Sequence, residues 1–260
     1  MRSRLLFLAL LLALVLFCMP TYARADQVSD NKVIVPPPSS TASALQLEET
    51  ADQLRARKDY NQAIAYYHAA MKQDPKNAVL FNKCGIAQLQ LNDTGGAIKN
   101  FKKALKLHPN YAEAFNNLGA AYYMEKSYKK AISQYNKAIA LRDYVATFHA
   151  NLGTAWFARQ KIDIAMQQYA RALQLDPDVM LRTSQVGIAA QVSSPEDRAQ
   201  LNFVLAKLYA RQGDVERSIQ CLRKAKDFGY SRMNDIYKDP EFAYVRNDPR
   251  FTGIMDEVGK

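Results

Sequence analysis

Apolar and polar residues follow one another in this chain with the period of amphipathic helices, and the same arrangement returns every 34 residues. Alanine marks the period at Ala63, Ala97, Ala131 and Ala165. Four residues after each alanine stands an aromatic residue, and these are Tyr67, Phe101, Tyr135 and Tyr169. Spacings of three, four and seven residues place side chains on one face of a helix. The pattern therefore predicts helix pairs repeated along the chain.

Other positions of the same frame are small or end a helix. Twelve residues before each alanine stand Ala51, Gly85, Gly119 and Gly153, and twelve after it stand Pro75, Pro109, Asp143 and Pro177. Positions 4, 7, 8 and 11 of the first helix share one arc at about 100° per residue. A small residue at position 8 lets two helix backbones approach, while aromatics at positions 11 and 24 fill the space beside them. One pair cannot bury both of its faces alone, so stacked copies are expected.

This arrangement resembles the tetratricopeptide repeat, whose period is 34 residues. Four full copies span 44–77, 78–111, 112–145 and 146–179, and a degenerate fifth copy spans 199–232. The departures from the pattern are Gln88 for an aromatic residue, Asp143 for proline and Ser218 for alanine. The resemblance implies an all-α, right-handed α-solenoid of about ten repeat helices that binds a protein or peptide in a concave groove.

Two segments interrupt or end the repeats. Residues 180–198 form an insertion that is either a structural adapter or a functional element. Near its end, Ser194 is expected to cap a helix that has Pro195 at its first position. Residues 233–260 contain Asp239-Pro240-Glu241-Phe242 and Asp248-Pro249-Arg250-Phe251. Each predicts a short helix with an apolar anchor, and together these helices would cap the last repeat.

The N-terminal segment predicts export. Basic residues and an apolar run from Leu5 to Met19 precede Ala23-Arg24-Ala25, which is typical of a signal peptide of residues 1–25 cleaved after Ala25. A retained membrane anchor is the rival, although the run is shorter than the roughly 20 residues that span a bilayer. Residues 26–43 contain three consecutive prolines and predict a disordered linker. The expected location is periplasmic or secreted.

Charge changes the picture of possible partners. The formal charge of the chain is +10, and the stretch from Lys72 to Arg142 contains 12 basic and 4 acidic residues. The candidate basic face consists of Lys99, Lys102, Lys103, Lys106, Lys126, Lys129 and Lys130. It is either a patch for an acidic protein, an anionic polymer or a membrane surface, or the solvated face of amphipathic helices. Export argues against nucleic acid as a partner.

The family resemblance also implies a ligand surface on the first helices, at repeat positions 2, 5, 6, 9 and 12. The residues at these positions include Asn82, Lys83, Asn116, Asn117, Tyr123, Asn151, Thr154 and Phe157. Asparagine amides can pair with the backbone of an extended peptide, and aromatics supply contact area. The alternative is that asparagine occurs at position 6 whatever the ligand. Glu48 and Asp52 stand where chaperone-tail binders carry basic and amide residues, which argues against such a clamp.

No arrangement of residues predicts catalysis. His68, His108 and His149 fall at different repeat positions, so no metal site is expected. Phosphate-binding and nucleophile motifs are absent from the sequence, so we expect neither enzymatic activity nor a cofactor. Cys84 and Cys221 are expected to be unpaired, buried thiols.

The sequence favours a protein-interaction scaffold. Two alternatives stay open: an envelope-assembly or secretion accessory factor held near a membrane by its basic face, and an anchoring or regulatory subunit of an enzyme complex. The oligomeric state stays open as well.

Overall fold

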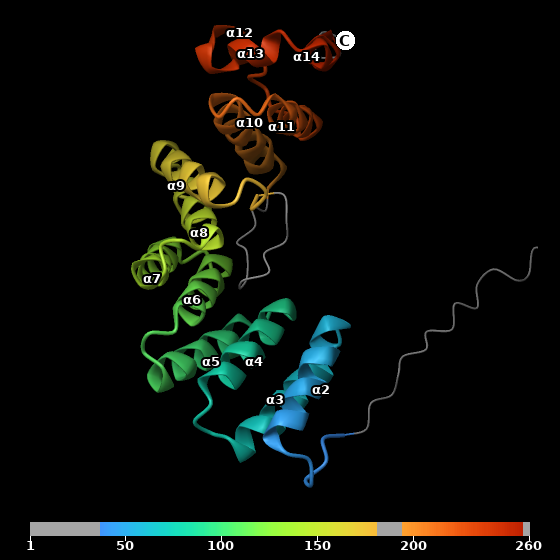
Figure 1. The fold of residues 1–260 in the computed structure, drawn as a ribbon, viewed down its shortest axis with the longest axis vertical. Coiled ribbons are helices and arrows are strands. Elements are labelled where there is room, and N and C mark those ends of the chain that lie inside the picture. Colours follow the sequence, from blue (N-terminus) through green and yellow to red (C-terminus); the bar gives the residue numbers. More distant parts are fainter. Residues whose placement is uncertain (1–36, 181–193, 257–260) are drawn as a thin grey trace, which may run out of the picture. The chain divides into compact units, whose positions relative to one another are not determined.

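The computed structural model describes residues 37–180 and 194–256, and these residues form helices and turns without any strand. Residues Pro38–Lys260 form one compact unit. Helix pairs follow one another in chain order along it (Figure 1). The signal peptide expected at 1–25, and the linker as far as residue 36, lie outside the described residues.

Five consecutive helix pairs correspond to the five expected repeats. Their bounds are α2 (Ala44–Ala56) with α3 (Tyr60–Gln73), α4 (Ala78–Gln90) with α5 (Thr94–Leu107), α6 (Ala112–Met124) with α7 (Tyr128–Leu141), α8 (Ala146–Phe157) with α9 (Ile162–Leu175), and α10 (Pro195–Arg211) with α11 (Val215–Asp227). Within each pair the two helices pack together, and α3, α5 and α7 also pack on the first helix of the next pair. The predicted α-solenoid is confirmed.

Each full repeat closes around a small residue at position 8 and an aromatic residue at position 24. A Cβ atom on Gly119 would stand 2.6 Å from the ring of Tyr135, and one on Gly153 would stand 2.8 Å from the ring of Tyr169. The alanines that mark the period are fully buried. The expected close approach of the two helices is therefore confirmed, because in these two repeats only a residue without a side chain leaves room for the ring.

The turn inside each pair has the same backbone in all five copies. The residue at position 15 has a positive φ, with values of 64° at Lys58, 60° at Asn92, 56° at Lys126, 59° at Gln160 and 77° at Gly213. The following N–H donates to the carbonyl five residues earlier, as from Asp214 to Tyr209 at 2.9 Å. This is the left-handed cap that commonly ends helices. The fifth pair thus keeps the register of the other four.

The hydrophobic core continues from the fourth pair into the fifth. Phe157 and Leu173 belong to the same buried cluster as Phe203 and Leu208 of α10. The hydroxyl of Tyr209 donates to the carbonyl of Pro177 at 2.9 Å. Apolar burial and this bond hold the two pairs together.

The helix expected after the insertion is present, but it begins inside the range given to the insertion. Ser194 accepts a bond from the N–H of Asp197 at 3.0 Å, and Pro195 is the first residue of α10. The boundary at residue 198 therefore lies within α10. Residues 181–193 fall outside the described part of the chain.

Short helices close the C-terminal end, as expected. They are α12 (Asp235–Lys238), η1 (Pro240–Phe242), α13 (Ala243–Arg246) and α14 (Pro249–Asp256). The side chain of Asp239 caps η1 by accepting from the N–H of Glu241 at 3.1 Å. Phe242 and Phe251 are buried in the cluster that contains α10 and α11. The two Asp-Pro segments therefore cover the last helix pair.

Candidate functional site

Amide side chains link the first helices of consecutive repeats. Asn117 Nδ2 donates to Asn82 Oδ1 at 3.0 Å, and Asn151 Nδ2 donates to Asn116 Oδ1 at 2.8 Å. Each bond joins position 6 of one repeat to position 5 of the preceding repeat, 35 residues earlier. Asn116 Nδ2 also donates to Asn117 Oδ1 at 3.3 Å, which joins the two bonds into one chain.

These four asparagines were expected to present their amides to a ligand, and the structure corrects that expectation. Each is 5% exposed or less, and each bonds to a neighbouring repeat. A side-chain amide that is buried needs hydrogen-bond partners, because leaving it unpaired is costly. The asparagines therefore act first as contacts between repeats.

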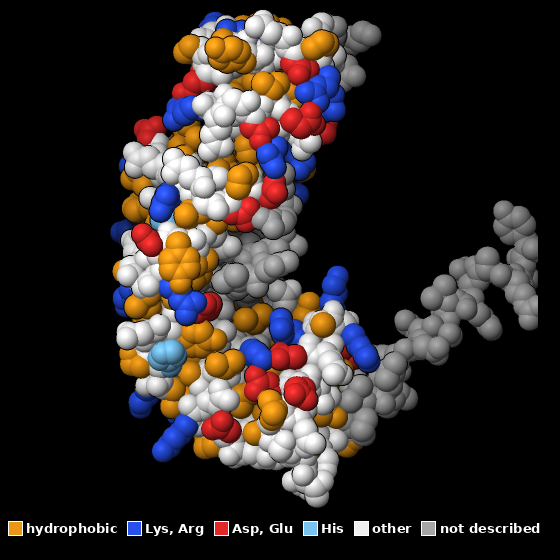
Figure 2. Space-filling model, in the orientation of Figure 1, with side chains coloured by type: hydrophobic (Ala, Val, Ile, Leu, Met, Phe, Trp, Pro, Cys, Tyr) orange, Lys and Arg blue, Asp and Glu red, His pale blue; other side chains and the backbone are white. Residues whose placement is uncertain are grey.

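Lys83 makes the equivalent contact between the first two repeats, with charge in place of amides. Its Nζ lies 2.6 Å from Glu48 Oε1 and 2.5 Å from Asp52 Oδ2. Burial alone would raise the pKa of Asp52, but hydrogen bonds from Lys83 and Tyr67 bring it below its usual value. Acidic and basic side chains stand side by side over α2 and α4 (Figure 2). The sequence carried a signal for this pair in the 35-residue spacing of opposite charges.

Position 12, which was assigned to the groove, belongs to the core of this chain. Leu89, Tyr123 and Phe157 occupy it in the second, third and fourth repeats, and all three are buried. Phe157 lies in the cluster that contains α10, and Tyr123 lies in one that contains Leu152 of α8. The groove assignments of Tyr123 and Phe157 are corrected for this reason: in each case the following repeat packs against the side chain.

The groove assignment of Thr154, at position 9, is also corrected. Its hydroxyl accepts a bond from the hydroxyl of Tyr169, at position 24 of the same repeat, at 3.2 Å. Asp52 and Tyr67 make the corresponding contact in the first repeat, at 2.5 Å. Position 9 therefore points to its own partner helix.

Two apolar side chains that the sequence analysis did not single out are exposed on the first helices. Leu45 is 63% exposed and Val79 is 40% exposed, and both occupy position 2 of their repeats. Glu48 and Lys83 stand one turn further along the same helices and remain partly exposed. Position 2 is thus more exposed on α2 and α4 than on α6 and α8. Position 2 was included in the expected arc, so the 34-residue spacing of Leu45 and Val79 was the available signal.

The seven lysines of the basic face are all exposed, as an external face requires. Among the described residues none of them forms an ion pair. Lys102 of α5 and Lys130 of α7 both lie over the ring of Tyr122, with Nζ 5.9 and 5.4 Å from its centroid. Cation–π attraction of this kind favours a fixed place for the ammonium groups. The second and third repeats therefore share one basic surface.

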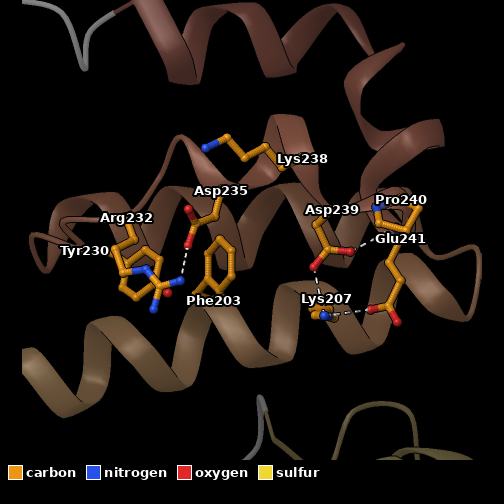
Figure 3. A pocket seen from close by; sticks show the side chains of 9 residues that line it. All are labelled: Phe203, Lys207, Tyr230, Arg232, Asp235, Lys238, Asp239, Pro240 and Glu241. Atoms are coloured by element: carbon orange, nitrogen blue, oxygen red, sulfur yellow. Dashed lines mark hydrogen bonds and ion pairs between the residues drawn. The ribbon is translucent and has the colours of Figure 1, made fainter.

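An open pocket of about 480 Å³ lies where α10 meets α12 and η1 (Figure 3). Phe203 and Tyr230 stack in it with their centroids 4.4 Å apart. Lys207 Nζ lies 2.8 Å from Asp239 Oδ2 and 3.5 Å from Glu241 Oε2. These ion pairs neutralise the charges that line the pocket. They join α10 to the terminal helices, so the residues of the pocket mainly stabilise the C-terminal cap.

The remaining candidate groups carry no cluster typical of a catalytic or metal site in the described ranges. Cys84 and Cys221 are unpaired and buried, as predicted. His149 is held by Gln168 and by the carbonyl of Asp143, at 3.0 and 2.9 Å. Across residues 37–180 and 194–256, no three His, Cys, Asp or Glu side chains gather in a way that could hold a metal ion. Nor does this part of the chain contain a helix with the length and apolarity needed to cross a bilayer.

Comparison with known proteins gives the same architecture. Family models match residues 89–126, described as TPR repeat, and residues 112–143 and 199–227, described as Tetratricopeptide repeat. The match at 199–227 falls within the degenerate fifth copy. No curated protein sequence matches the chain at a significant level.

Solved structures with the same fold include two from named bacteria. MamA 41-end from Desulfovibrio magneticus RS-1 is 20% identical with a TM-score of 0.51, and the alignment covers 76% of this chain and 99% of that one. TTC0263, a thermophilic TPR protein in Thermus thermophilus, is 19% identical with a TM-score of 0.52, over 75% and 96% of the two chains. At these identities the likeness is one of fold alone.

The paired helices, their repeated turn and the glycine–aromatic contacts define an α-solenoid. The family models identify the helices at 89–126, 112–143 and 199–227 as tetratricopeptide repeats.

Proposed function

We propose that this protein is a non-catalytic interaction scaffold that binds a protein or peptide partner on the exposed first-helix surface of α2 and α4. The observation that carries the proposal is the pair Leu45 and Val79, which are exposed at the same position of consecutive repeats. Position 2 of α6 is Glu113, which forms an ion pair with Arg142, and position 2 of α8 is Thr147, which is buried. The open part of the surface is therefore at the N-terminal repeats.

The chemistry of this surface suits a short amphipathic segment. Leu45 and Val79 offer two apolar anchor points, and burial of each by a partner would contribute on the order of 1 kcal/mol. Lys83, with Glu48 and Asp52 beside it, supplies charges at the rim, where they favour orientation and partner choice more than affinity. The partner that fits best carries two apolar side chains flanked by polar or charged ones.

The same proposal places the protein outside the cytoplasm. Its support is the N-terminal sequence, in which Arg2 and Arg4 precede the apolar run and Ala23-Arg24-Ala25 precedes Asp26. Sequencing the N-terminus of the protein purified from its own source tests this part. A chain that begins at Asp26 supports cleavage, and one that retains Arg2 contradicts it.

Affinity capture tests the binding surface. The chain from Asp26 onward, which retains the whole compact unit, is used beside a variant with Leu45→Ser and Val79→Ser. We expect the partner to be lost from the double variant. Leu91→Ser is the matched control, because Leu91 is 39% exposed but lies at the end of α4. Retention by the double variant, or equal loss in the control, would place the partner elsewhere.

A further inference from the structure

We propose that the basic face formed by the seven lysines of α5, the turn before α7 and α7 docks on an anionic lipid surface. It goes beyond the binding surface proposed on α2 and α4, because it lies on the second helices of the second and third repeats. The argument depends on the arrangement of the lysines, on the absence of acidic partners for them among the described residues and on the kind of contact that lysine makes.

The lysines of α5 lie on one side of the helix. Lys99, Lys102, Lys103 and Lys106 are separated by three, one and three residues, so they cover one narrow stripe about two turns long. On α7, Lys129 and Lys130 stand in the first turn, and Lys126 precedes them in the turn between α6 and α7. Basic side chains project along the edge of the molecule formed by α5 and α7 (Figure 2).

The two stripes form one surface rather than two. Lys102 and Lys130 belong to different repeats, yet both ammonium groups lie less than 6 Å from the centroid of the Tyr122 ring, at 5.9 and 5.4 Å. Lys103 lies over Phe81 in the same way, at 5.8 Å. Ring contacts of this kind place like charges next to one another without an acid between them.

Basic residues elsewhere in the described structure do have acidic partners, unlike the seven lysines of the basic face. Lys83, Arg142, Lys207 and Arg217 each form at least one ion pair within the chain. The seven lysines of the basic face form none among the described residues. A concentrated charge of one sign attracts a surface of the opposite sign, and the described part of the chain leaves this charge without compensation.

The type of residue favours lipid headgroups over a protein with fixed carboxylates. Every residue of the face is lysine, whose ammonium acts as a point charge and makes no bidentate contact of defined geometry. Headgroups that move laterally need no such geometry. Among the described residues α5 has no exposed large apolar side chain, and those nearest along the chain to the other lysines are Met124 before the turn and Leu141 at the end of α7. The contact would therefore be mainly electrostatic. Docking in this way leaves Leu45 and Val79, on the first helices, free for the proposed partner.

Co-sedimentation with vesicles tests the proposal. The chain from Asp26 onward is used, because the apolar run from Leu5 to Met19 would itself bind lipid. We expect binding to phosphatidylcholine vesicles that contain about one-third phosphatidylglycerol, and none to phosphatidylcholine alone. Raising the salt from about 0.1 M to about 1 M should release the protein, since screening shortens the range of these charges.

Two variants with equal changes of charge separate this face from general basicity. The first replaces Lys99, Lys106, Lys126 and Lys129 with Gln, and the second replaces Lys58, Lys161, Lys224 and Lys238 with Gln. All eight are exposed, and in the described structure none of them has an ion-pair or ring contact. The first variant should lose vesicle affinity by more than about tenfold, and the second should lose far less.

Three results would overturn the proposal. The first is absence of binding to the anionic vesicles, and the second is an equal loss of vesicle affinity in the two variants. The third is binding of the parent chain to poly-glutamate without binding to vesicles, which would assign the face to an acidic polypeptide. Affinity capture with the first variant distinguishes failure of the lipid surface from failure of the partner surface on α2 and α4. This variant should still capture the partner that depends on Leu45 and Val79.

Discussion

The amide nitrogen of Asn151 donates to the carbonyl oxygen of Asn116, 35 residues earlier, at 2.8 Å. Both side chains are almost completely buried. Asn116→Ala should therefore lower the free energy of unfolding by about 1–3 kcal/mol, because it removes a buried partner from each of two neighbouring amides. Urea unfolding followed by circular dichroism measures the loss. Asn110→Ala, in an exposed turn, is the control and should change the value by less than about 0.5 kcal/mol. Equal effects would show that the amide contacts contribute nothing.

Gly119 and Tyr135 supply a second test of the packing. A Cβ atom on Gly119 would stand 2.6 Å from the ring, so Gly119→Leu should overpack the third repeat and destabilise it by about 1–3 kcal/mol. The melting temperature measures this. Gly95→Ala is the control, because a Cβ atom there meets nothing within 4 Å. A melting curve of Gly119→Leu that coincides with the parent would contradict the register of the repeats.

The backbone of the fifth turn can be tested without changing any contact. Gly213 has a φ of +77°, and a Cβ atom there would meet no other atom within 4 Å. Gly213→Ala should cost about 1–2 kcal/mol, because an L-residue strains in this conformation. Gly213→Asn should cost less, since asparagine tolerates it and already stands at the same position as Asn92. Chemical denaturation of the two variants compares them, and equal stabilities would refute the left-handed cap.

Two tyrosines at position 24 should respond in opposite directions to loss of the hydroxyl. Tyr169 donates to Thr154, whereas the buried hydroxyl of Tyr135 has no hydrogen-bond partner among the described residues. Position 9 explains the difference, because it is threonine in the fourth repeat and Ala120 in the third. Tyr169→Phe should destabilise the protein by about 0.5–1.5 kcal/mol, and Tyr135→Phe should leave it unchanged or more stable. Thermal unfolding of both variants decides, and destabilisation by Tyr135→Phe would show that the hydroxyl does have a partner.

Burial should protect both thiols from modification. It raises the pKa of Cys84 to about 12 and that of Cys221 to about 11, so almost no thiolate exists at neutral pH. Because the thiolate is the reactive form, an aromatic disulfide reagent should not label the folded chain from Asp26 at about pH 8 within minutes. The same chain in denaturant is the control and should react at both thiols. Rapid labelling of the folded protein would mean that the cysteines are not buried.

The sequence predicted the helix pairs and their internal packing because those depend on contacts that recur inside one repeat. Gly119 and Tyr135 lie 16 residues apart in the same repeat, and the pattern of neighbouring copies marks both positions. The caps at Ser194 and Asp239 were predicted for a similar reason, since a cap depends on residues a few places away.

The candidate groove was predicted less well, because its exposure depends on the neighbouring repeat. The arc of the first helix placed Asn116 and Asn117 on the side away from their own partner helix. It could not show that Asn151 and Asn82 would cover them from the two adjacent repeats. Phe157 was misplaced for the same reason, since its neighbours in α10 lie beyond the interruption of the period.

The junctions between first helices differ in chemistry along the chain, and this gives each end of the stack its own sensitivity to solvent. Lys83 and Glu48 make the first junction ionic, whereas Ala150 and Val204 stand at the matching positions between the fourth and fifth repeats. The lowered pKa of Asp52 means that its contribution is complete above the unfolded value and is lost as pH falls through the folded value. Acid therefore weakens the first junction through Asp52, while cooling weakens the apolar contact between α8 and α10. The two junctions thus respond to different changes of solvent.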